Sequence, residues 1–513
     1  MSFLNRLTVA GRQAEREQAE NIIHEVDAEN NLPPIDEKQP LITLPVVACG
    51  AGLFSDGYIN NVIGSVTTIL ALEYGDTWSN SRAKSVVSAI VFAGTVVGQL
   101  FFGVLADRWS RTNSLLVSTV ILFVFTALAA GSYYHGDTIG MFNMLAAWRF
   151  FVGIGIGGEY PAGSVGCAES TGEIRSGWRH FVFILFTNSI IDFGFVIGAF
   201  VPYVVAAACH NGHLGTQWRT SLGIGTVFPL VLFVMRLFVK ENEEFNRNSM
   251  KGARTPYWLV LKFYGPRLVV VSLIWFIYDF LTYAFGIYSS TILANIFPSG
   301  SPLTTIFGWN VVINLFYMPG SLLGAKASDW LGPRWCLITG VLLQAMVGFI
   351  MAGDYANLSQ PHMVGAFATV YGIFLSLGEF GPGNNIGLLA AKTCATGVRG
   401  QYYGIAAAVG KIGAFVGTYV YPYIEAAGGD STTASAQYPF FVSSSLSVLS
   451  ALLAFFLLPN VGQDTIQYED ARFRRYLEAN GWDTAQLGLR KEDSVEHVEN
   501  GAGVMSENKS ASL

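Results

Sequence analysis

Charged residues are scarce in this chain. Only 13% of its 513 residues are Asp, Glu, Lys or Arg, whereas 51% are hydrophobic. Soluble domains usually carry about 25% charged residues. A large soluble helical protein would also need polar stripes at helical spacing, which most of the apolar stretches lack. The composition therefore argues against a soluble protein and indicates a chain that lies mostly within a bilayer.

Cysteine is also rare, and the sequence lacks the side-chain sets that support catalysis. Five scattered cysteines, mostly in apolar segments, predict neither a disulfide framework nor a metal site. No paired-histidine motif, metal-ligand set or nucleophile–base pair appears, which argues against a membrane enzyme such as a phosphodiesterase. We therefore expect no enzyme activity, no cofactor and no metal. The net charge of −6 is spread over tails and loops and indicates no nucleic-acid partner.

One glycine run imitates a nucleotide-binding motif. Residues 153–158 read Gly-Ile-Gly-Ile-Gly-Gly, but a dinucleotide site needs a preceding strand within a βαβ unit. This run lies inside an apolar stretch, where small residues three or four apart let helices approach closely. We predict helix packing here, and without a nucleotide-binding domain an ion gradient is the expected energy source.

Long apolar stretches dominate what the chain does contain. Each is close to the ~20 residues that cross a bilayer as a helix. The twelve predicted spans are 42–68, 85–106, 113–131, 140–165, 181–206, 220–239, 268–296, 303–325, 335–354, 362–391, 400–423 and 438–458. The expected fold class is an all-α membrane protein of twelve transmembrane helices.

The same reading divides the chain into five parts. Polar composition predicts disordered tails at both ends, with a short surface helix at 466–481 inside the second tail. The predicted parts are a tail at 1–40, a six-helix half at 41–239, an inter-half loop at 240–267, a second six-helix half at 268–459 and a tail at 460–513. Lys and Arg concentrate in the loops after even-numbered spans, so the positive-inside rule places both termini and the 240–267 loop in the cytosol.

A short charged pattern occurs at matching places in the two halves. The first copy, Gly103-Val-Leu-Ala-Asp107-Arg108-Trp-Ser-Arg111, and the second, Gly324-Ala-Lys-Ala-Ser-Asp329-Trp-Leu-Gly-Pro-Arg334, each lie between two apolar runs. We interpret each as a charged clasp at the water interface, between helices that slide past each other. The repeat favours a two-half transporter over a channel, a receptor or a membrane enzyme.

Seven ionisable residues fall well inside the predicted spans, away from their ends. Each costs at least ~2.5–3.5 kcal/mol on insertion scales, so each is a functional candidate. They are Asp56, Arg149, Glu159, Asp192, Asp279, Glu379 and Lys411. A proton-coupled carrier needs a carboxyl that takes up a proton near neutral pH, and this set is rich in acids. The alternative is that some pairs only lock helices together.

Spacing sharpens two of these positions. Trp275, Asp279 and Tyr283 are four residues apart, so they share one helix face and form a small polar wall. Core packing is an equally good interpretation of Trp275 alone. Lys411 lies between two glycines, and a lone ammonium in such a helix is expected to meet an anion.

Several separated motifs resemble one family. Gly-Ile-Gly-Gly-Glu159-Tyr160-Pro161, Trp275-x-x-x-Asp279-x-x-x-Tyr283, Phe380-Gly-Pro-Gly-Asn384 and Val409-Gly-Lys411-Ile-Gly-Ala resemble the phosphate:proton symporters of the major facilitator superfamily. Within it, Phe54-Ser-Asp56-Gly-Tyr58 and residues 257–264 are similar to the fungal glycerophosphodiester permeases. The resemblance implies two six-helix halves with one site between them near the bilayer midplane.

The resemblance also implies roles for individual residues. Proton coupling is expected of Asp56, Arg149 and Glu159. The phosphate group is expected to be surrounded by Tyr160, Asn188, Trp275, Asp279, Tyr283 and Lys411. The first charged pattern resembles the loop motif of the superfamily but has Ser110 where glycine is usual. Two positions depart from the phosphate carriers: Glu159 replaces an aspartate and Gly383 an asparagine. The loss of a side chain at 383 is expected to open room for a substrate larger than phosphate.

Two acids lie outside these motifs, Asp192 and Glu379, and Asn384 follows Gly383. A carboxylate among aromatic rings suits a quaternary ammonium group, so we assign these three residues to the substrate headgroup and favour glycerophosphocholine over glycerophosphoinositol. The alternatives are a polar helix contact for Asp192 and a further proton site for Glu379.

The expected function is therefore proton-driven import of a glycerophosphodiester across a fungal plasma membrane, by a chain that works as a monomer. Two alternatives stay open. One is an inorganic phosphate:proton symporter, which Gly383 opposes. The other is a transporter-like nutrient sensor that binds substrate without net transport. A sugar porter is disfavoured by Lys411 and Asp279 inside the membrane.

Overall fold

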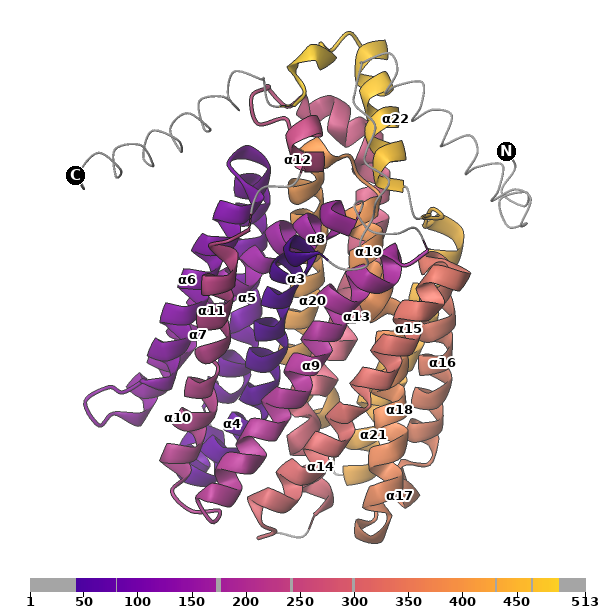
Figure 1. Cartoon of the computed structure of the whole chain (residues 1–513). Coiled ribbons are helices and arrows are strands. Elements are labelled where there is room, and N and C mark those ends of the chain that lie inside the picture. Colours follow the sequence, from indigo (N-terminus) through magenta and orange to yellow (C-terminus); the bar gives the residue numbers. More distant parts are fainter. Residues whose placement is uncertain are drawn as a thin grey trace, which may run out of the picture.

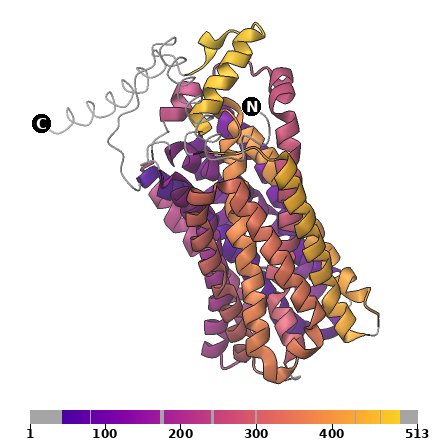
Figure 2. The same cartoon turned by 90° about the vertical axis from the view of Figure 1, so that its right-hand side faces the viewer.

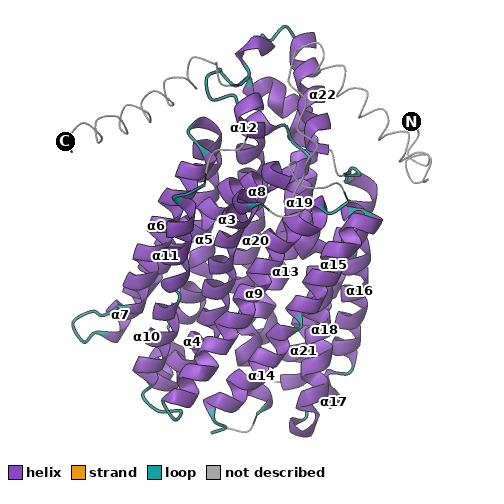
Figure 3. Ribbon diagram, in the orientation of Figure 1, coloured by secondary structure: helices purple, strands orange, loops and turns teal. Residues whose placement is uncertain are grey.

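The computed structural model describes residues 43–79, 81–171, 177–239, 243–297, 300–429, 431–462 and 465–488. The tail predicted at 1–40, and the predicted C-terminal tail from 489 onward, lie outside these ranges. Within them every regular element is a helix (Figure 3). The predicted all-α class is confirmed.

The first half of the chain forms the indigo to magenta side of the bundle (Figure 1). Its elements are α3 (Leu44–Gly50), η1 (Ala51–Leu53), α4 (Phe54–Ser79), α5 (Ala83–Arg108), α6 (Arg111–Ala130), α7 (Thr138–Gly158), η2 (Glu159–Ser164), α8 (Val165–Ser170), α9 (Arg179–Ala208), α10 (Leu214–Ile224) and α11 (Val227–Arg236).

The second half forms the opposite side, and the two halves stand side by side. Its elements are α12 (Glu243–Asn248), α13 (Tyr257–Ile296), α14 (Leu303–Leu315), α15 (Tyr317–Leu331), α16 (Pro333–Gly353), α17 (Tyr355–Leu358), α18 (Val364–Gly378), η5 (Glu379–Gly383), α19 (Asn384–Lys392), η6 (Thr396–Val398), α20 (Arg399–Ala426), α21 (Thr432–Leu457) and α22 (Thr465–Ala479). Part of the predicted inter-half loop is helical, because α13 already begins at Tyr257.

The described chain has eleven helices that are long and apolar enough to cross a membrane. In this count consecutive helices that form one span, such as α10 and α11, are taken together. The remaining predicted span, the first in the chain, corresponds to α4, which has 26 residues. Its first turns carry Asp56, Asn60 and Asn61, and these buried polar residues lower its hydropathy. The span nearest the start of the chain is therefore the most polar one, and it lies in the interior of the bundle.

The halves meet along helices that line the centre of the molecule. Helix α20 packs on α5, α13 packs on α4, and α14 and α15 pack on α9. At one end of the bundle, α22 projects beyond the ends of most of the long helices (Figures 1 and 2); we call this the α22 end. Phe473 and Leu477 of α22 are buried there against Tyr264 and Val398, which confirms the short helix predicted at 466–481.

The glycine run of α7 serves helix packing, as predicted. A Cβ added at Gly153 would lie 2.0 Å from the carbonyl oxygen of Val91 in α5, and one added at Gly98 would lie 2.3 Å from that of Ile154. Such backbone approach is open only to glycine. It brings α5 against α7 and fixes where the following residues, Glu159 and Tyr160, enter the bundle.

Each half contains one π-helical turn that begins with a glutamate and includes a proline. In the first half it is η2, with Glu159 and Pro161, and in the second it is η5, with Glu379 and Pro382. Proline cannot donate the hydrogen bond of a regular α-helix, and a π-turn accommodates the local change of register, often at functional sites. Both turns lie where the resemblance placed substrate or proton residues.

Candidate functional site

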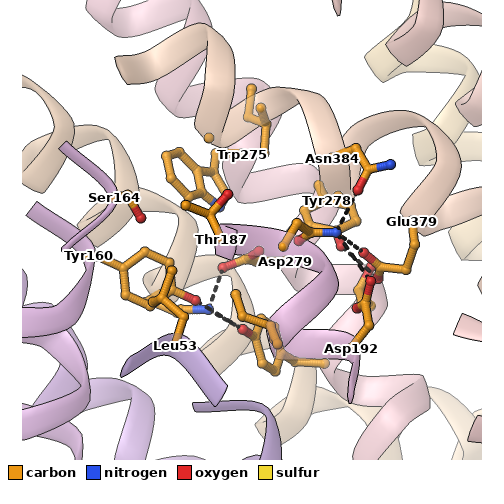
Figure 4. A pocket seen from close by; sticks show the side chains of 18 of the residues that line it. Leu53, Tyr160, Ser164, Thr187, Asp192, Trp275, Tyr278, Asp279, Glu379 and Asn384 are labelled. Atoms are coloured by element: carbon orange, nitrogen blue, oxygen red, sulfur yellow. Dashed lines mark hydrogen bonds and ion pairs between the residues drawn. The ribbon is translucent and has the colours of Figure 1, made fainter. Parts of the chain in front are cut away.

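A small cavity lies between the two halves, with a volume of about 40 Å³. Its wall combines Tyr160, Asn188 and Asp192 of the first half with residues of α13, η5, α19 and α20 from the second. Figure 4 shows two polar groups in this wall: Asp279 lies on one side, while Asp192, Glu379 and Asn384 gather on the other. We call these groups the lysine cluster and the glutamate cluster.

The lysine cluster is centred on Lys411 of α20. Its Nζ atom lies 3.3 Å from Oδ2 of Asp279 and 3.8 Å from Oδ2 of Asp56, and it donates a hydrogen bond to the hydroxyl of Tyr283. The Tyr283 hydroxyl in turn donates to Asp56 at 3.2 Å, and the hydroxyl of Tyr160 donates to the same carboxylate. Four predicted residues from both halves therefore meet Lys411 at one point.

Close packing of α20 on α13 fixes the position of the lysine. A Cβ at Gly410 would lie 2.6 Å from the indole of Trp275, and one at Gly413 would lie 2.2 Å from the carbonyl oxygen of Phe276. These glycines bring the Lys411 backbone within side-chain reach of the polar wall on α13. The prediction that Trp275, Asp279 and Tyr283 share one helix face is confirmed, and all three line the cavity.

The lysine cluster contains more acidic than basic groups. One ammonium faces the carboxyl groups of Asp56 and Asp279, and all three side chains are 1% exposed. Burying charges is costly unless they are paired. An anion entering this cluster would be attracted by Lys411 and repelled by any carboxylate that keeps its charge, so protonation of a carboxyl favours anion binding.

The glutamate cluster is organised by the side-chain amide of Asn188 in α9. Its Nδ2 atom lies 2.9 Å from Oε2 of Glu379, 3.0 Å from Oδ1 of Asn384 and 3.4 Å from Oδ2 of Asp192. The hydroxyl of Tyr278 donates to the other Glu379 oxygen at 2.8 Å. The three residues predicted for the headgroup are therefore neighbours, and Asn188, predicted beside the phosphate, lies among them.

The predicted proton residues separate in space. Asp56 belongs to the lysine cluster, whereas Glu159 points away from the cavity and accepts from both terminal nitrogens of Arg236, at 2.7 and 2.5 Å. Ser118 also donates to Glu159, at 2.9 Å. Arg149 lies apart from both, with its Nε atom donating to the carbonyl oxygen of Val87 at 2.7 Å.

The first predicted clasp joins the two halves at the α22 end. Asp107 pairs with Arg111 at 2.6 Å and accepts from the backbone N–H groups of Gly400 and Gln401, at 2.9 and 2.8 Å. These two groups belong to the first turn of α20, where the helix dipole favours a negative charge. Arg108, in contrast, donates to the carbonyl oxygen of Ala253 at 3.1 Å.

The second clasp differs from the first. Asp329 lies 3.8 Å from Nδ1 of His180, which belongs to the other half. Arg334 donates to the carbonyl oxygens of Ala454 and Phe455 in its own half, the first at 3.3 Å. The two copies of the sequence pattern therefore make unlike contacts: Asp107 reaches the other half through backbone N–H groups of α20, and Asp329 through His180.

Sequence reasoning missed three charged residues in these networks. Glu169 of α8 bridges Arg111 and Arg399, each at 3.0 Å, and so adds an inter-half ion pair to the first clasp. Arg236 is the third, because an arginine near the end of a span is ordinarily grouped with the loop that follows. In the structure it is 1% exposed. Its place in the last turn of an apolar span, with an acid in the neighbouring span, was the available signal.

Comparison with known proteins identifies relatives over most of the chain. The family model described as "Sugar (and other) transporter" matches residues 44–248 and 240–471. The chain is 50% identical to a glycerophosphodiester transporter of Candida albicans, covering 86% of this chain and 84% of the relative. It is also 47% identical to a glycerophosphocholine permease (91% and 87%) and 46% identical to a major glycerophosphoinositol permease (88% and 86%) of that organism.

Solved structures share the fold. A structure of the proton:xylose symporter XylE from E. coli matches with a TM-score of 0.69 at 16% identity, covering 84% of this chain and 98% of that one. At this identity the likeness concerns the arrangement of the helices alone.

Proposed function

The chain belongs to the sugar (and other) transporter family of the major facilitator superfamily, whose members are transporters rather than enzymes, and from this premise we propose that it imports glycerophosphodiesters together with protons. The observation that carries the proposal is the lysine cluster. It offers one buried cation and three phenol or indole donors to a phosphate group, beside two carboxyls that can hold protons.

The proposed cycle follows from the charges in that cluster. Facing outward, Asp56, Glu159 and Asp279 take up protons. At Asp56 and Asp279 this removes the repulsion of an anion and lets the carboxyl groups donate hydrogen bonds to it. Lys411 then neutralises the phosphate, and Tyr160, Trp275 and Tyr283 orient it. After the halves rock to the other side, the higher pH removes the proton and the restored carboxylate charge helps to expel the substrate.

The glutamate cluster is the proposed site of the headgroup. Asp192 and Glu379 suit a quaternary ammonium group through charge, and Tyr278 adds an aromatic surface. We therefore favour glycerophosphocholine over glycerophosphoinositol. Replacing Asp192 with Asn is expected to weaken glycerophosphocholine uptake much more than glycerophosphoinositol uptake, and equal losses would contradict the headgroup assignment.

The orientation and setting complete the proposal. The α22 end carries most of the loop arginines and lysines, so it faces the cytosol with both termini. The membrane is the plasma membrane, and a single chain contains both halves of the site.

Uptake by a host that lacks its own phosphate and glycerophosphodiester carriers tests the proposal. Labelled glycerophosphocholine, glycerophosphoinositol and phosphate are offered at acid and near-neutral pH, with and without an uncoupler. Diester uptake that is stronger at acid pH and abolished by the uncoupler is the expected result. Uptake of phosphate alone would make the chain an inorganic phosphate symporter, and binding without accumulation would make it a sensor.

A further inference from the structure

Gly383 has a neighbour that the sequence did not predict. A Cβ added at this position would lie 2.0 Å from Oε2 of Glu379 and 2.6 Å from the hydroxyl oxygen of Tyr278. The room left by the missing side chain is therefore occupied by the carboxyl group of Glu379. We expected this room to admit a larger substrate directly, but in the structure it holds the Glu379 side chain instead.

The position of the Glu379 carboxyl depends on the local helix geometry. Glu379 and Gly383 are the first and last residues of η5 and are four positions apart, so they share a face of the turn. Oε1 of Glu379 accepts from Tyr278 and Oε2 from Asn188, at 2.8 and 2.9 Å. A buried carboxyl, here 1% exposed, needs such donors, and any side chain at 383 would push it away from both.

The cluster around this carboxyl has more acceptors than donors. The Asn188 amide has two hydrogens, yet Glu379, Asn384 and Asp192 each place an oxygen within 3.4 Å of its nitrogen. The Ser321 hydroxyl adds one donor, which serves Oδ1 of Asn384 at 3.2 Å. Among the described residues, nothing donates a hydrogen bond to Oδ1 of Asp192, which is fully buried. The nearby Lys411 is engaged with Asp279, Asp56 and Tyr283 in the other cluster. The cluster is thus suited to a ligand group that brings positive charge.

We propose that Gly383 is a specificity-determining residue, which seats the Glu379 carboxyl between Asn188 and Tyr278 and thereby builds a subsite for cationic headgroups beside the phosphate site. This inference rests on the proposed function. Gly383 acts only through Glu379: it contributes no contact of its own to the substrate, and its role is the absence of a Cβ.

The first experiment compares two diesters in one variant. Gly383→Ala is expected to shift the ratio of apparent affinities for glycerophosphocholine and glycerophosphoinositol by at least about tenfold against the choline diester, which corresponds to ~1.4 kcal/mol. The matched control is Gly387→Ala, which lines the same cavity but whose Cβ would meet the Tyr403 hydroxyl at 3.1 Å instead. Its ratio should stay within a factor of about two.

The second experiment is a double-mutant cycle with Glu379→Ala. With the carboxyl gone, an alanine at 383 no longer displaces it and keeps only its contact with the Tyr278 hydroxyl oxygen, at 2.6 Å, so the double variant should show a ratio close to that of Glu379→Ala alone. A Gly383→Ala shift that persists in full in the Glu379→Ala background overturns the proposal. Should Gly383→Ala alone fail to reach the membrane, the double variant, in which the contact with the Glu379 carboxyl is relieved, supplies the same comparison with Glu379→Ala.

The outcomes separate this inference from the proposed function. A wild-type chain that accumulates neither diester contradicts the proposed function. A wild-type chain that accumulates both, with a Gly383→Ala ratio equal to wild type or with equal losses of both diesters, contradicts only the role of Gly383.

Discussion

At the scale of single residues, the centre of the molecule is a balance between one lysine and two aspartates. Lys411 contacts carboxyl groups from α4 and α13, and so it touches both halves at once. Its Nζ atom also lies 3.8 Å from the centre of the Tyr283 ring. Such a lysine is held in place without a ligand, and it can exchange a carboxylate partner for a phosphate with little movement.

Replacing Lys411 with Met should raise the KM for glycerophosphodiester uptake by about 10- to 100-fold, because a hydrogen bond to a charged group contributes about 1.5–3 kcal/mol. Kinetics of uptake, normalised to the amount of protein in the membrane, measure the effect. Lys262→Met is the control, since Lys262 is exposed on the protruding part of α13. An unchanged KM would show that Lys411 does not bind the phosphate.

Glu159→Gln distinguishes proton coupling from helix locking. We expect the variant to lose pH-driven accumulation while it still exchanges labelled for unlabelled substrate, because a neutral amide cannot carry the proton. The substitution also leaves Arg236 without its charged partner, and breaking a buried pair costs about 3–5 kcal/mol. The double variant Glu159→Gln with Arg236→Gln controls for that loss. Retained pH-driven accumulation would mean that Glu159 only ties α11 to η2.

The sequence predicted the lysine cluster better than its surroundings. Asp56, Asp279 and Lys411 could be found because charge inside an apolar span is costly and therefore rare. The role of Arg236 was not predicted, because it lies at the end of a span, where an arginine is common and does not by itself indicate a functional site. The contact between Gly383 and Glu379 was also not predicted. Sequence spacing shows that the two residues share a helix face, but it does not show that the Glu379 carboxyl fills the space beside Gly383.

At the scale of elements, α22 is attached to the inter-half clasp by specific polar contacts. Asp470 accepts from the backbone N–H and the hydroxyl of Thr396, at 2.6 and 2.7 Å, and lies 3.8 Å from Arg399. Arg399 also pairs with Glu169 of the first half. Burial raises the pKa of Asp470, although the nearby Arg399 opposes this shift. Helix α22 therefore supports the same residues that hold the halves together.

Asp470→Ala should release α22 from this end of the bundle. The variant leaves two donors of Thr396 unsatisfied, each costing about 1–3 kcal/mol, so hydrogen exchange in residues 465–479 is expected to speed up strongly. Arg472→Ala is the control, because its side chain is 43% exposed and its pair with Glu469 at 3.6 Å contributes little. Equal exchange in both variants would show that α22 is held by its apolar face alone.

At the scale of the whole molecule, the two ends of the bundle are closed by different chemistry. At the α22 end, Asp107 and Glu169 connect the halves through charges. At the opposite end the halves meet mainly through neutral groups: Asn61 donates to Asn314, the hydroxyls of Thr68 and Ser290 are 3.2 Å apart, and the backbone N–H of Thr304 donates to Asn211. Lys84 of α5 also attracts Glu425 of α20 by charge across the halves at this end. A neutral hydrogen bond contributes only about 0.5–1.5 kcal/mol, so the end opposite α22 opens at lower cost.

This asymmetry could be predicted only in part. The repeated charged pattern correctly indicated an ionic clasp at the α22 end, but the unlike contacts of its second copy depend on His180, which lies 149 positions from Asp329 in the chain. The neutral contacts at the other end leave almost no signal, since serine, threonine and asparagine are common in transmembrane helices that pack together.

A disulfide across the end opposite α22 tests whether that end must open for transport. Thr68 and Ser290 belong to different halves and their side-chain oxygens are 3.2 Å apart, close enough that cysteines there can approach the geometry of a disulfide. The chain with Thr68→Cys and Ser290→Cys should lose uptake on oxidation and regain it with a reductant, whereas either single substitution should be insensitive.

The five native cysteines are free, and four of them are buried, so the background reaction is small. The cavity lies between two ends that are both bridged by contacts between the halves, so substrate enters only when one end widens. Full uptake by the completely cross-linked chain would therefore mean that this end is not the entrance.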